Sequence, residues 1–292
     1  MDRLSNPRLS TSMITNSDAQ EHPVLVLGGT GKTGRRVATR LTERGIPVRI
    51  GSRSGTPAFD WNDDSTWAAT LDGARAAYLV YYPDLALPGA AETVGALARE
   101  AVERGVEHLV LLSGRGEEGA RRGEQAVQAA GAAWTIVRAS WFSQNFSEDH
   151  LVEPVRSGEL TLPAGDVAEP FVDADDIADV VVAALTEPRH IGQVYEVTGP
   201  RLLTLADVAA EISTATGRTV RYVPVTSAEY AAAALAHGVP VDVVDALTML
   251  FTEVLDGRNA SLCDGIERAL GRPPRDFGDY ARATARTGVW AG

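Results

Sequence analysis

The segment PVLVLGGTGKTGRRVATRLTERG, residues 23–45, decides the fold of this chain. It opens with an apolar run of strand length, passes through closely spaced glycines, and continues with apolar residues at helical spacing. The glycines stand three residues apart, at Gly28, Gly31 and Gly34. A strand that turns through glycines into a helix is typical of the first βαβ unit of a parallel sheet. We therefore predict a strand at 23–28 and a helix at 33–45.

The same alternation continues along the chain and predicts a parallel sheet with helices on both faces. Further strands are expected at 47–52, 76–82, 107–113 and 133–139, with a short third strand just before Asp60, and helices at 89–104 and 117–130. Beyond residue 140 the elements become shorter. They are a helix at 173–187, a strand at 192–199, a helix at 204–217, a strand at 218–225 and a mostly helical stretch at 226–292.

This pattern predicts the α/β class: a doubly wound parallel sheet of the Rossmann type, with a smaller and mostly helical C-terminal lobe. We divide the chain into a disordered tail at 1–21, a dinucleotide-binding core at 22–150 and a substrate lobe at 151–292 that sends segments back to the core sheet.

The composition of the chain excludes several classes of function and partner. The formal charge of the 292 residues is −12, which disfavours nucleic acid and anionic membranes as partners. No apolar run approaches the roughly 18 residues that cross a bilayer. Cys263 is the only cysteine, so an internal disulfide is impossible, and the polar segment 1–21 lacks the apolar region of a signal peptide. We expect a cytoplasmic protein.

The glycine turn predicts a dinucleotide site, because glycines let the backbone approach a pyrophosphate and the helix N-terminus attracts the anion. A merely structural turn is the alternative. The residues expected at the pyrophosphate are Gly28, Thr30, Gly31, Lys32, Thr33 and Gly34. A P-loop is excluded, since that motif needs a glycine five residues before Gly31, where this chain has Val26.

The second strand indicates which dinucleotide binds. An enzyme that uses NAD carries Asp or Glu near its end, but this chain has Ser52 and Arg53 there, which suit the 2′-phosphate of NADP. Residues 32–53 also hold seven basic side chains against one acid, Glu43. We expect Lys32 and Arg36 to assist Arg53. For Arg40 and Arg44 we favour a solvated helix face.

Four more residues are expected beside the cofactor. Asp60 and Trp61 stand where such folds place groups against the adenine, although a loop carboxylate and a packed indole would explain them equally well. Tyr81 and Tyr82 end a strand where the cofactor crosses the sheet. Tyr78, inside that strand, is expected in the core.

Several longer segments together resemble the NmrA-like atypical short-chain dehydrogenases, a family that includes quinone oxidoreductase-like proteins and redox sensors that bind NADP without turnover. The resemblance covers about 23–290. It rests on VLVLGGTGKTG, GVEHLVLLSGRG, WTIVRASWFSQNF, PFVDADDIADV, YEVTGP with LTLADVAAEIS, and GRPPRDFGDYA.

This chain departs from the catalytic pattern of typical short-chain dehydrogenases. Typical short-chain dehydrogenases use a Tyr-x-x-x-Lys pair, in which the lysine helps the tyrosine pass a proton to a carbonyl. Lys32 is the only lysine here and Gly28 stands four residues before it, so the pair cannot exist. Ser113 keeps a hydroxyl after its strand, but Gly114 follows where a second serine is common.

Hydride transfer to an electron-poor acceptor does not need that pair. We name Tyr81, Ser113 and Asn145 as candidate catalytic residues. Trp141, Phe142 and Gln144 are the candidate substrate contacts, since they follow a strand beside the expected nicotinamide. Core packing for the two aromatic residues and helix capping for Asn145 are equally open.

Two other features bear on function. The acidic run at Asp173, Asp175 and Asp176 precedes a helix and favours N-terminal capping over a metal site, so no metal is expected. Met249, Leu250 and Phe251 lie in an apolar stretch that could roof a substrate pocket, belong to the core or form a dimer face.

The leading prediction is an NADPH-dependent oxidoreductase that transfers a hydride to a quinone-like or other conjugated small molecule. A non-catalytic NADP(H) sensor acting through a partner protein, and a tailoring enzyme of specialised metabolism, are the alternatives. A homodimer is compatible with all three.

Overall fold

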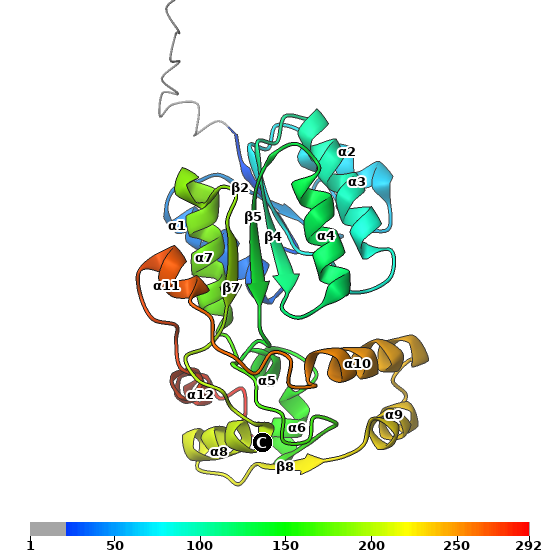
Figure 1. Cartoon of the computed structure of the whole chain (residues 1–292), viewed down its shortest axis with the longest axis vertical. Helices are drawn as coiled ribbons and strands as arrows, with labels where there is room; N and C mark the ends of the chain where they lie inside the picture. Colours follow the sequence, from blue (N-terminus) through cyan, green and yellow to red (C-terminus); the bar gives the residue numbers. More distant parts are fainter. Residues whose placement is uncertain (1–21, 292) are drawn as a thin grey trace, which may run out of the picture.

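The computed structural model describes residues 22–291, except for the side chains of residues 242, 246, 250 and 253. The predicted tail at 1–21 and the side chain of Leu250 therefore lie outside the described residues. Six parallel strands form the main sheet in the order β2-β1-β3-β4-β5-β7 (Figure 1). They are β1 (Val24–Leu27), β2 (Val48–Gly51), β3 (Ala76–Leu79), β4 (His108–Gly114), β5 (Ala133–Ala139) and β7 (Val194–Val197). Because the strand order reverses beside β1, the carboxyl ends of β1 and β3 border a crevice.

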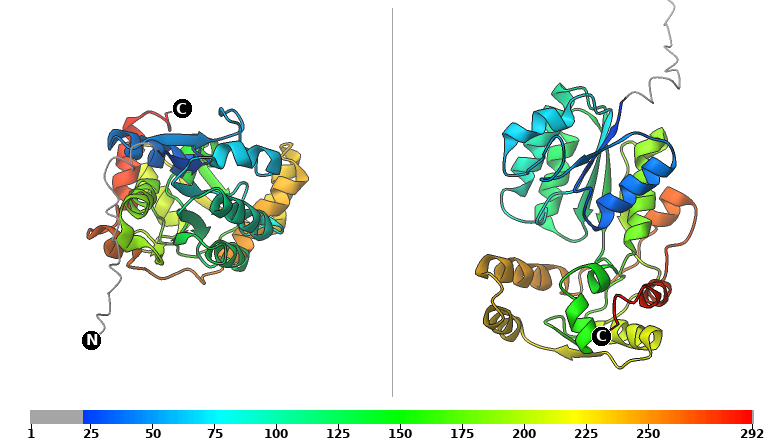
Figure 2. Two further views of the ribbon diagram at one scale, coloured as in Figure 1. Left: turned by 90° about the horizontal axis from the view of Figure 1, so that it is seen from above. Right: turned by 180° about the vertical axis from the view of Figure 1, so that it is seen from behind.

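Helices cover both faces of this sheet (Figures 1 and 2). One face carries α1 (Lys32–Glu43) and α7 (Ala174–Thr186), with α11 (Gly265–Leu270) beside β7. The other face carries α2 (Trp67–Leu71), α3 (Ala90–Glu103) and α4 (Glu118–Gln128). Two short 3-10 turns, η2 (Asp64–Thr66) and η3 (Pro188–His190), complete the core. The predicted doubly wound α/β fold is confirmed.

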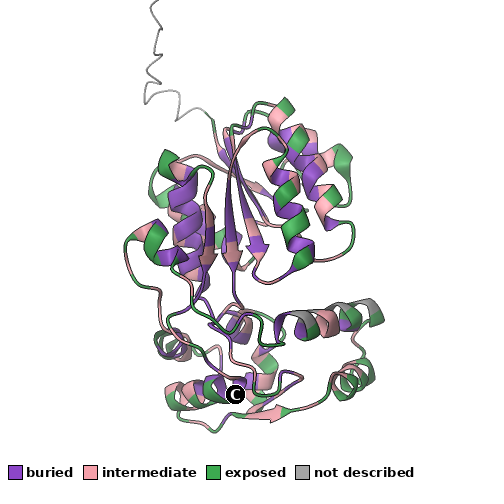
Figure 3. Cartoon of the chain, viewed as in Figure 1, coloured by how far each residue is buried: buried purple, intermediate pink, exposed green. Residues whose placement is uncertain are grey.

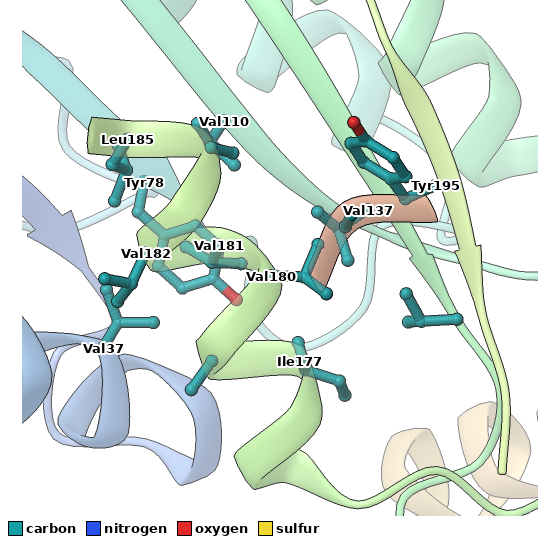
Figure 4. Close-up of a cluster of buried hydrophobic side chains, with 14 of the residues drawn as sticks. Val37, Tyr78, Val110, Val137, Ile177, Val180, Val181, Val182, Leu185 and Tyr195 are labelled. Carbon is teal, nitrogen blue, oxygen red and sulfur yellow. The ribbon is translucent and has the colours of Figure 1, made fainter. Parts of the chain in front are cut away.

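The residues of β1 show why this strand decides the fold. All four are fully buried, and successive side chains point to opposite faces. Val24 and Val26 join the cluster that includes Val37 of α1 and the valines of α7, whose side chains Figure 4 shows meeting those of the sheet. Leu25 and Leu27 pack against α2 and α3. A continuous apolar run can be buried in full only when helices cover both faces of the strand, as they do here (Figure 3).

The smaller lobe lies across the carboxyl ends of the strands (Figure 1). Its helices are α5 (Asn145–Glu148), α6 (Val152–Ser157), α8 (Leu205–Thr216), α9 (Ser227–Ala236), α10 (Val241–Val254) and α12 (Phe277–Arg286). A two-stranded parallel sheet pairs β6 (Glu159–Leu162) with β8 (Arg221–Pro224). The lobe has its own apolar cluster, in which Phe146, Phe171 and Phe277 meet with ring centroids less than 6 Å apart.

Two local predictions need correction. The short third strand expected before Asp60 does not form: residues 53–59 are turns and irregular backbone, in which Gly55 and Pro57 interrupt any pairing. The strand predicted at 76–82 ends at Leu79, so Tyr81 and Tyr82 lie in the loop beyond it. In the described part of the chain, no helix combines the length and the apolar character that crossing a bilayer requires.

Candidate cofactor and substrate site

A cavity of about 2240 Å³ lies between the carboxyl ends of the strands and the smaller lobe. Its core side is formed by the loops that follow β1 to β5, and its lobe side by α5, α6, β6, α9 and α10. Pockets for single small ligands usually measure about 300 to 1,000 Å³. The cavity is therefore large enough for a dinucleotide together with a second molecule.

The glycine turn forms one end of this cavity. Gly28 adopts a positive φ of 64°, which L side chains rarely tolerate, and its carbonyl accepts a hydrogen bond from the Gly31 amide at 2.8 Å. A Cβ atom on Gly34 would lie 2.2 Å from the same carbonyl. Gly34 does not line the cavity, and its role is to let α1 pack directly against the turn.

The first turn of α1 fits a pyrophosphate. The helix begins at Lys32 behind Gly31, which has no side chain to cap the free amides, and no acidic residue stands in the first turn. Those amide N–H groups can donate hydrogen bonds to an anion, and the positive end of the helix dipole also attracts it. The cavity lining includes Gly28, Thr30, Gly31, Lys32 and Thr33. The Thr33 hydroxyl also accepts a hydrogen bond, at 3.0 Å, from Tyr78, which is fully buried in the core as predicted.

Acids from other elements neutralise most of the basic residues of α1. Lys32 pairs with Asp149, and Arg35 and Arg36 pair with Glu148, so the first turns of α1 are tied to the lobe through α5. Burial raises the pKa of Glu148, but the hydrogen bond and charge of Arg36, assisted by Arg35, outweigh it and lower that pKa below its usual value.

Two expectations about these arginines change as a result. Arg40 is not on a solvated face: it pairs with Asp179 at 2.7 Å and with Asp175 at 2.5 Å on α7. Arg36 is likewise occupied by Glu148 and Asp175, and it does not line the cavity. Most of the positive charges of residues 32–53 that lie on α1 are therefore neutralised by acidic residues of α7 and of α5 and its C-terminal end. These acids lie more than a hundred residues away in the sequence.

Arg53 differs from its neighbours. It lies on the surface just after β2, lines the cavity beside Ser52, and has no hydrogen-bond or ion-pair partner among residues 22–291. Arg49, on β2, is by contrast bound to the carbonyls of Thr70 and Asp72 at 2.8 and 2.6 Å. Arg53 thus presents an unoccupied guanidinium at the position where an NADP enzyme binds the 2′-phosphate.

The aromatic residues at the edge of the cavity form a packed group. The ring centroids of Trp61 and Tyr81 are 5.0 Å apart, and the Trp61 indole N–H donates to the carbonyl of Val80 at 3.0 Å. Asp60 lines the cavity, while its carboxylate accepts the amide of Asn62. Tyr82 is 70% exposed at the rim. All four residues border the cavity, although the indole of Trp61 is mainly a packed side chain.

Ser113 is committed to a buried polar network. Its hydroxyl donates to Glu124 at 2.6 Å, and Glu124 accepts two further hydrogen bonds from Arg138. Arg138 also reaches Glu196, at 3.1 Å. A Cβ on Gly114 would lie 1.9 Å from the Glu117 carboxylate, so a second serine here would require the Glu117 side chain to move. Ser113 lines the cavity, but its proton is directed to Glu124.

Some residues of the segment after β5 line the cavity, and others are buried in the core. Trp141, Phe142 and Asn145 line the cavity, and the side-chain amide of Asn145 has no hydrogen-bond partner within the described residues. Gln144 must be removed from the predicted substrate contacts. It is 2% exposed, does not line the cavity, and binds Asp173 and the Ala174 amide at the start of α7.

The lobe contributes residues that the sequence did not identify, above all Tyr230 on α9 and Asp245 on α10. Phe251 packs in the lobe core and also lines the cavity, with its ring 5.3 Å from Trp141 and 5.2 Å from Tyr230. The capping box of Thr226 and Glu229 marks the start of α9 in the sequence, but it gives no sign that the helix faces a cavity.

The acidic run before α7 is used for structure. Asp173 caps the helix, as predicted, by accepting the Asp175 amide at 2.8 Å. Asp176 is fully buried and pairs with Arg275 and, at 2.7 Å, with Arg272. These pairs hold the C-terminal segment against α7.

Solved structures with the same fold carry nicotinamide cofactors. The triphenylmethane reductase of Citrobacter sp. complexed with NADP(H) matches with a TM-score of 0.72 at 18% identity, over 90% of this chain and 99% of that one. The NADPH-dependent quinone oxidoreductase of Escherichia coli complexed with NADPH matches with a TM-score of 0.75 at 20% identity, over 89% and 99%. At this level of identity the likeness concerns the fold.

Comparison of sequences identifies the family. An NAD(P)H azoreductase of Xenophilus azovorans is 34% identical over 284 residues, which cover 90% of this chain and 98% of that protein. The model of the NmrA-like family matches residues 122–277, just over half of the chain. The protein belongs to the NmrA-like family.

Proposed function

We propose that this protein is an NADPH-dependent oxidoreductase that transfers a hydride to a conjugated organic acceptor. The observation that carries the proposal is a single continuous cavity with two different ends. One end has the glycine turn, the uncapped start of α1 and the free guanidinium of Arg53; the other has the rings of Trp141 and Phe251. The 34% identical relative that is named an NAD(P)H azoreductase supports the same class of activity.

The residues of the core would hold the cofactor. Backbone amides at the start of α1 bind the pyrophosphate, and Arg53 with Ser52 binds the 2′-phosphate. Asp60 and Trp61 border the adenine side, and Tyr81 and Tyr82 border the path across the sheet. When bound, the reduced nicotinamide supplies a hydride. We assign this binding to residues 22–150. Acceptor binding is assigned to 151–292, from which α7, β7 and α11 return to the core, together with Trp141, Phe142 and Asn145 of the segment that follows β5.

The acceptor would lie against Trp141 and Phe142, which offer flat apolar surfaces. The side-chain amide of Asn145, which has no partner among the described residues, can orient it by a hydrogen bond. Ser113 is an unsuitable proton donor, because its hydroxyl is committed to Glu124 and the chain has no Tyr-x-x-x-Lys pair. This leaves Tyr81 and Asn145 of the three candidate catalytic residues. We assign to the protein mainly the tasks of binding and orienting the acceptor, which we expect to be electron-poor.

The test is NADPH oxidation, followed by loss of reduced-nicotinamide absorbance, against a panel of quinones, azo and triarylmethane dyes and enones. We expect turnover with at least one class and a preference for NADPH over NADH. An enzyme that binds NADPH tightly but oxidises it with no member of the panel would contradict the proposal.

One observation favours a second candidate, an NADP(H) sensor that acts through a partner protein. The hydroxyl that short-chain dehydrogenases use for catalysis is here directed into the Ser113–Glu124–Arg138 network, which suits binding without turnover. A sensor should bind NADPH and NADP with different affinities and change its association with a partner, or its homodimerisation, with the redox state. Under either reading we propose a cytoplasmic location, since the single cysteine gives no disulfide.

A further inference from the structure

Two acidic residues line the cavity in the loops that follow β3 and β4. Asp84 lies in the loop after β3, and Glu117 lies in the loop after β4. In the sheet, β3 and β4 lie on one side of β1, and β2 lies on the other. Because Arg53 after β2 is assigned to the adenosine end of the cofactor, the nicotinamide end would lie over β3 and β4. Both carboxyl groups therefore border the half of the cavity in which hydride transfer is expected.

The carboxylate of Glu117 takes the space of a missing side chain on β4. A Cβ atom on Gly114 would lie 1.9 Å from one carboxylate oxygen of Glu117 and 2.5 Å from the other. Glu117 precedes α4, but its side chain does not cap that helix, and the residue is only 9% exposed. The carboxylate thus lies against the end of β4, where the neighbouring Ser113 is bound to Glu124.

The loop that carries Asp84 packs closely against α4. A Cβ atom on Gly119 would lie 2.1 Å from the carbonyl oxygen of Ala86, and one on Gly123 would lie 2.7 Å from the side chain of Leu85. Larger residues at these two positions would push the helix away from the loop. The amide of Ala86 donates to the carboxylate of Asp84 at 2.8 Å. These contacts fix Asp84 beside the first turns of α4.

Asp84 has the properties of a proton donor. It is half-buried in the cavity wall, and burial raises the pKa of its carboxyl group, although the hydrogen bond from Ala86 opposes this shift. Among residues 22–291, no group donates to its second oxygen, and no lysine or arginine pairs with it. A carboxyl group of this kind keeps its proton to a higher pH and can pass it to a bound molecule.

The other charged and titratable groups around Asp84 differ in exposure. The elements packed around it place four of them in the cavity wall: Asp60, Tyr81, Tyr82 and Glu117. The first turns of α4 add Glu118, Arg121 and Arg122, which are exposed and lie outside the cavity. Arg115 is bound to the carbonyl of Asn259 at 2.8 Å. The exposed charges of α4 are screened by solvent, so they influence Asp84 little.

We propose that Asp84 is the proton donor of the reaction. The proposal rests on the proposed function and adds a catalytic residue to it. The hydride forms a bond to an electrophilic atom of the acceptor, and the π electron pair moves to the oxygen or nitrogen at the other end of the conjugated system. That atom takes the proton of Asp84. The acceptor gains two electrons and two hydrogens, the dihydronicotinamide is oxidised, and the Asp84 carboxylate regains a proton from water.

The first test needs neither cofactor nor acceptor. In protein whose aspartate carboxyl carbons carry ¹³C, NMR follows the titration of each group, and Asp84→Asn identifies the signal of Asp84. Asparagine keeps an oxygen for the Ala86 amide, so the loop should fold normally. We expect Asp84 to titrate above about 3.9, the pKa of an ordinary aspartate. Titration at or below that value would overturn the proposal.

The second test follows kcat/KM for menadione, a small quinone, against pH. In the wild type we expect a fall of about tenfold per pH unit above the pKa of Asp84, because only the protonated form is active. In Asp84→Asn this fall should be absent, and the value at low pH should be about 100-fold lower. Asp64→Asn removes an exposed carboxylate outside the cavity and should behave as the wild type.

Two further variants distinguish Asp84 from its neighbours. Tyr81→Phe and Glu117→Gln should both keep the pH dependence of the wild type, whatever their effect on the rate. If either of them abolishes that dependence while Asp84→Asn retains it, the proton comes from the neighbour and the proposal fails.

NADPH oxidation by the wild type separates this inference from the proposed function. If quinones are reduced and Asp84→Asn keeps the rate and the pH dependence of the wild type, the inference about Asp84 alone fails. If NADPH binds and no acceptor is reduced, the proposed function fails, and the proton donor falls with it.

Discussion

Arg53 is the residue on which cofactor selection depends. Replacing it with alanine removes a charge-assisted contact to a 2′-phosphate, worth about 1.5–3 kcal/mol, so NADPH should bind roughly 10- to 100-fold more weakly. NADH binding should hardly change, because it lacks that phosphate. Fluorescence titration of both cofactors measures this. Arg44→Ala, which removes another exposed arginine outside the cavity, should leave both affinities intact. An equal loss for the two cofactors in the Arg53 variant would refute the 2′-phosphate assignment.

Asn145 and Gln144 are neighbours with separate tasks. Asn145 lines the cavity and its side-chain amide has no partner among the described residues, so Asn145→Ala should lower kcat/KM roughly tenfold through the loss of one hydrogen bond to the acceptor. Thermal stability should stay unchanged. Steady-state kinetics measures the loss in kcat/KM, and calorimetry on the same sample checks that the thermal stability is unchanged. Unchanged kinetics would remove Asn145 from the site.

At the scale of elements, α7 depends on its cap. Gln144 accepts the Ala174 amide at 2.7 Å and donates to Asp173 at 2.8 Å, all within the buried junction of core and lobe. Gln144→Ala leaves those groups unsatisfied and should cost about 1–3 kcal/mol of unfolding free energy in urea. NADPH affinity of the folded protein should not change. A variant as stable as the wild type would show that Asp173 alone suffices as cap.

The elements that the sequence predicts well are those whose signal is local. Strands β1, β2, β4 and β5 are apolar runs with flanking glycines, and their positions agree with prediction within a few residues. The expected strand before Asp60 failed because its two apolar residues, Ala58 and Phe59, follow Gly55 and Pro57. β6 was missed because only four residues, ELTL, alternate, and their partner strand lies about sixty residues later.

The site shows the same limit. The glycine turn and Arg53 could be named from sequence, because the turn, the helix and the strand end stand close together in the chain. Contacts between distant segments decide the rest. They pair Arg40 with α7, and they place Gln144 in the core while Asn145 lines the cavity. Adjacent polar residues after a strand give no sequence signal of which one points into a cavity.

At the scale of the whole molecule, one buried carboxylate marks the junction of core and lobe. Glu169 is 1% exposed, and neither of its oxygens has a hydrogen-bond partner among the described residues. Its backbone pairs with Leu203 in both directions at 2.9 Å, which fixes it in place. Burial raises its pKa to about 7, with the charge of Arg115 opposing and that of Asp256 adding to the shift.

This raised pKa predicts how stability varies with pH. In the unfolded chain Glu169 loses its proton near its ordinary pKa, whereas the folded protein holds it until about pH 7. Its contribution to stability is therefore full at low pH and is lost as the pH rises from the unfolded to the folded value. Glu169→Gln should be more stable than the wild type at about pH 8, by the order of 3 kcal/mol, and equal to it near pH 4.

Chemical unfolding across this pH range measures the difference. Glu107→Gln, which changes an exposed glutamate, is the control and should show no such dependence. A constant difference between Glu169→Gln and the wild type at all pH values would show that the carboxyl group is not held protonated in the folded protein.

The central claim is that the two ends of the cavity bring NADPH and an acceptor into contact for direct hydride transfer. The most direct measurement is a single turnover with NADPH deuterated at C4, prepared separately for each face of the ring, with mass spectrometry of the reduced acceptor. We predict that one of the two labelled forms delivers its deuterium to the product. A product without deuterium from either form, or no product from any acceptor while NADPH stays bound, would contradict the account.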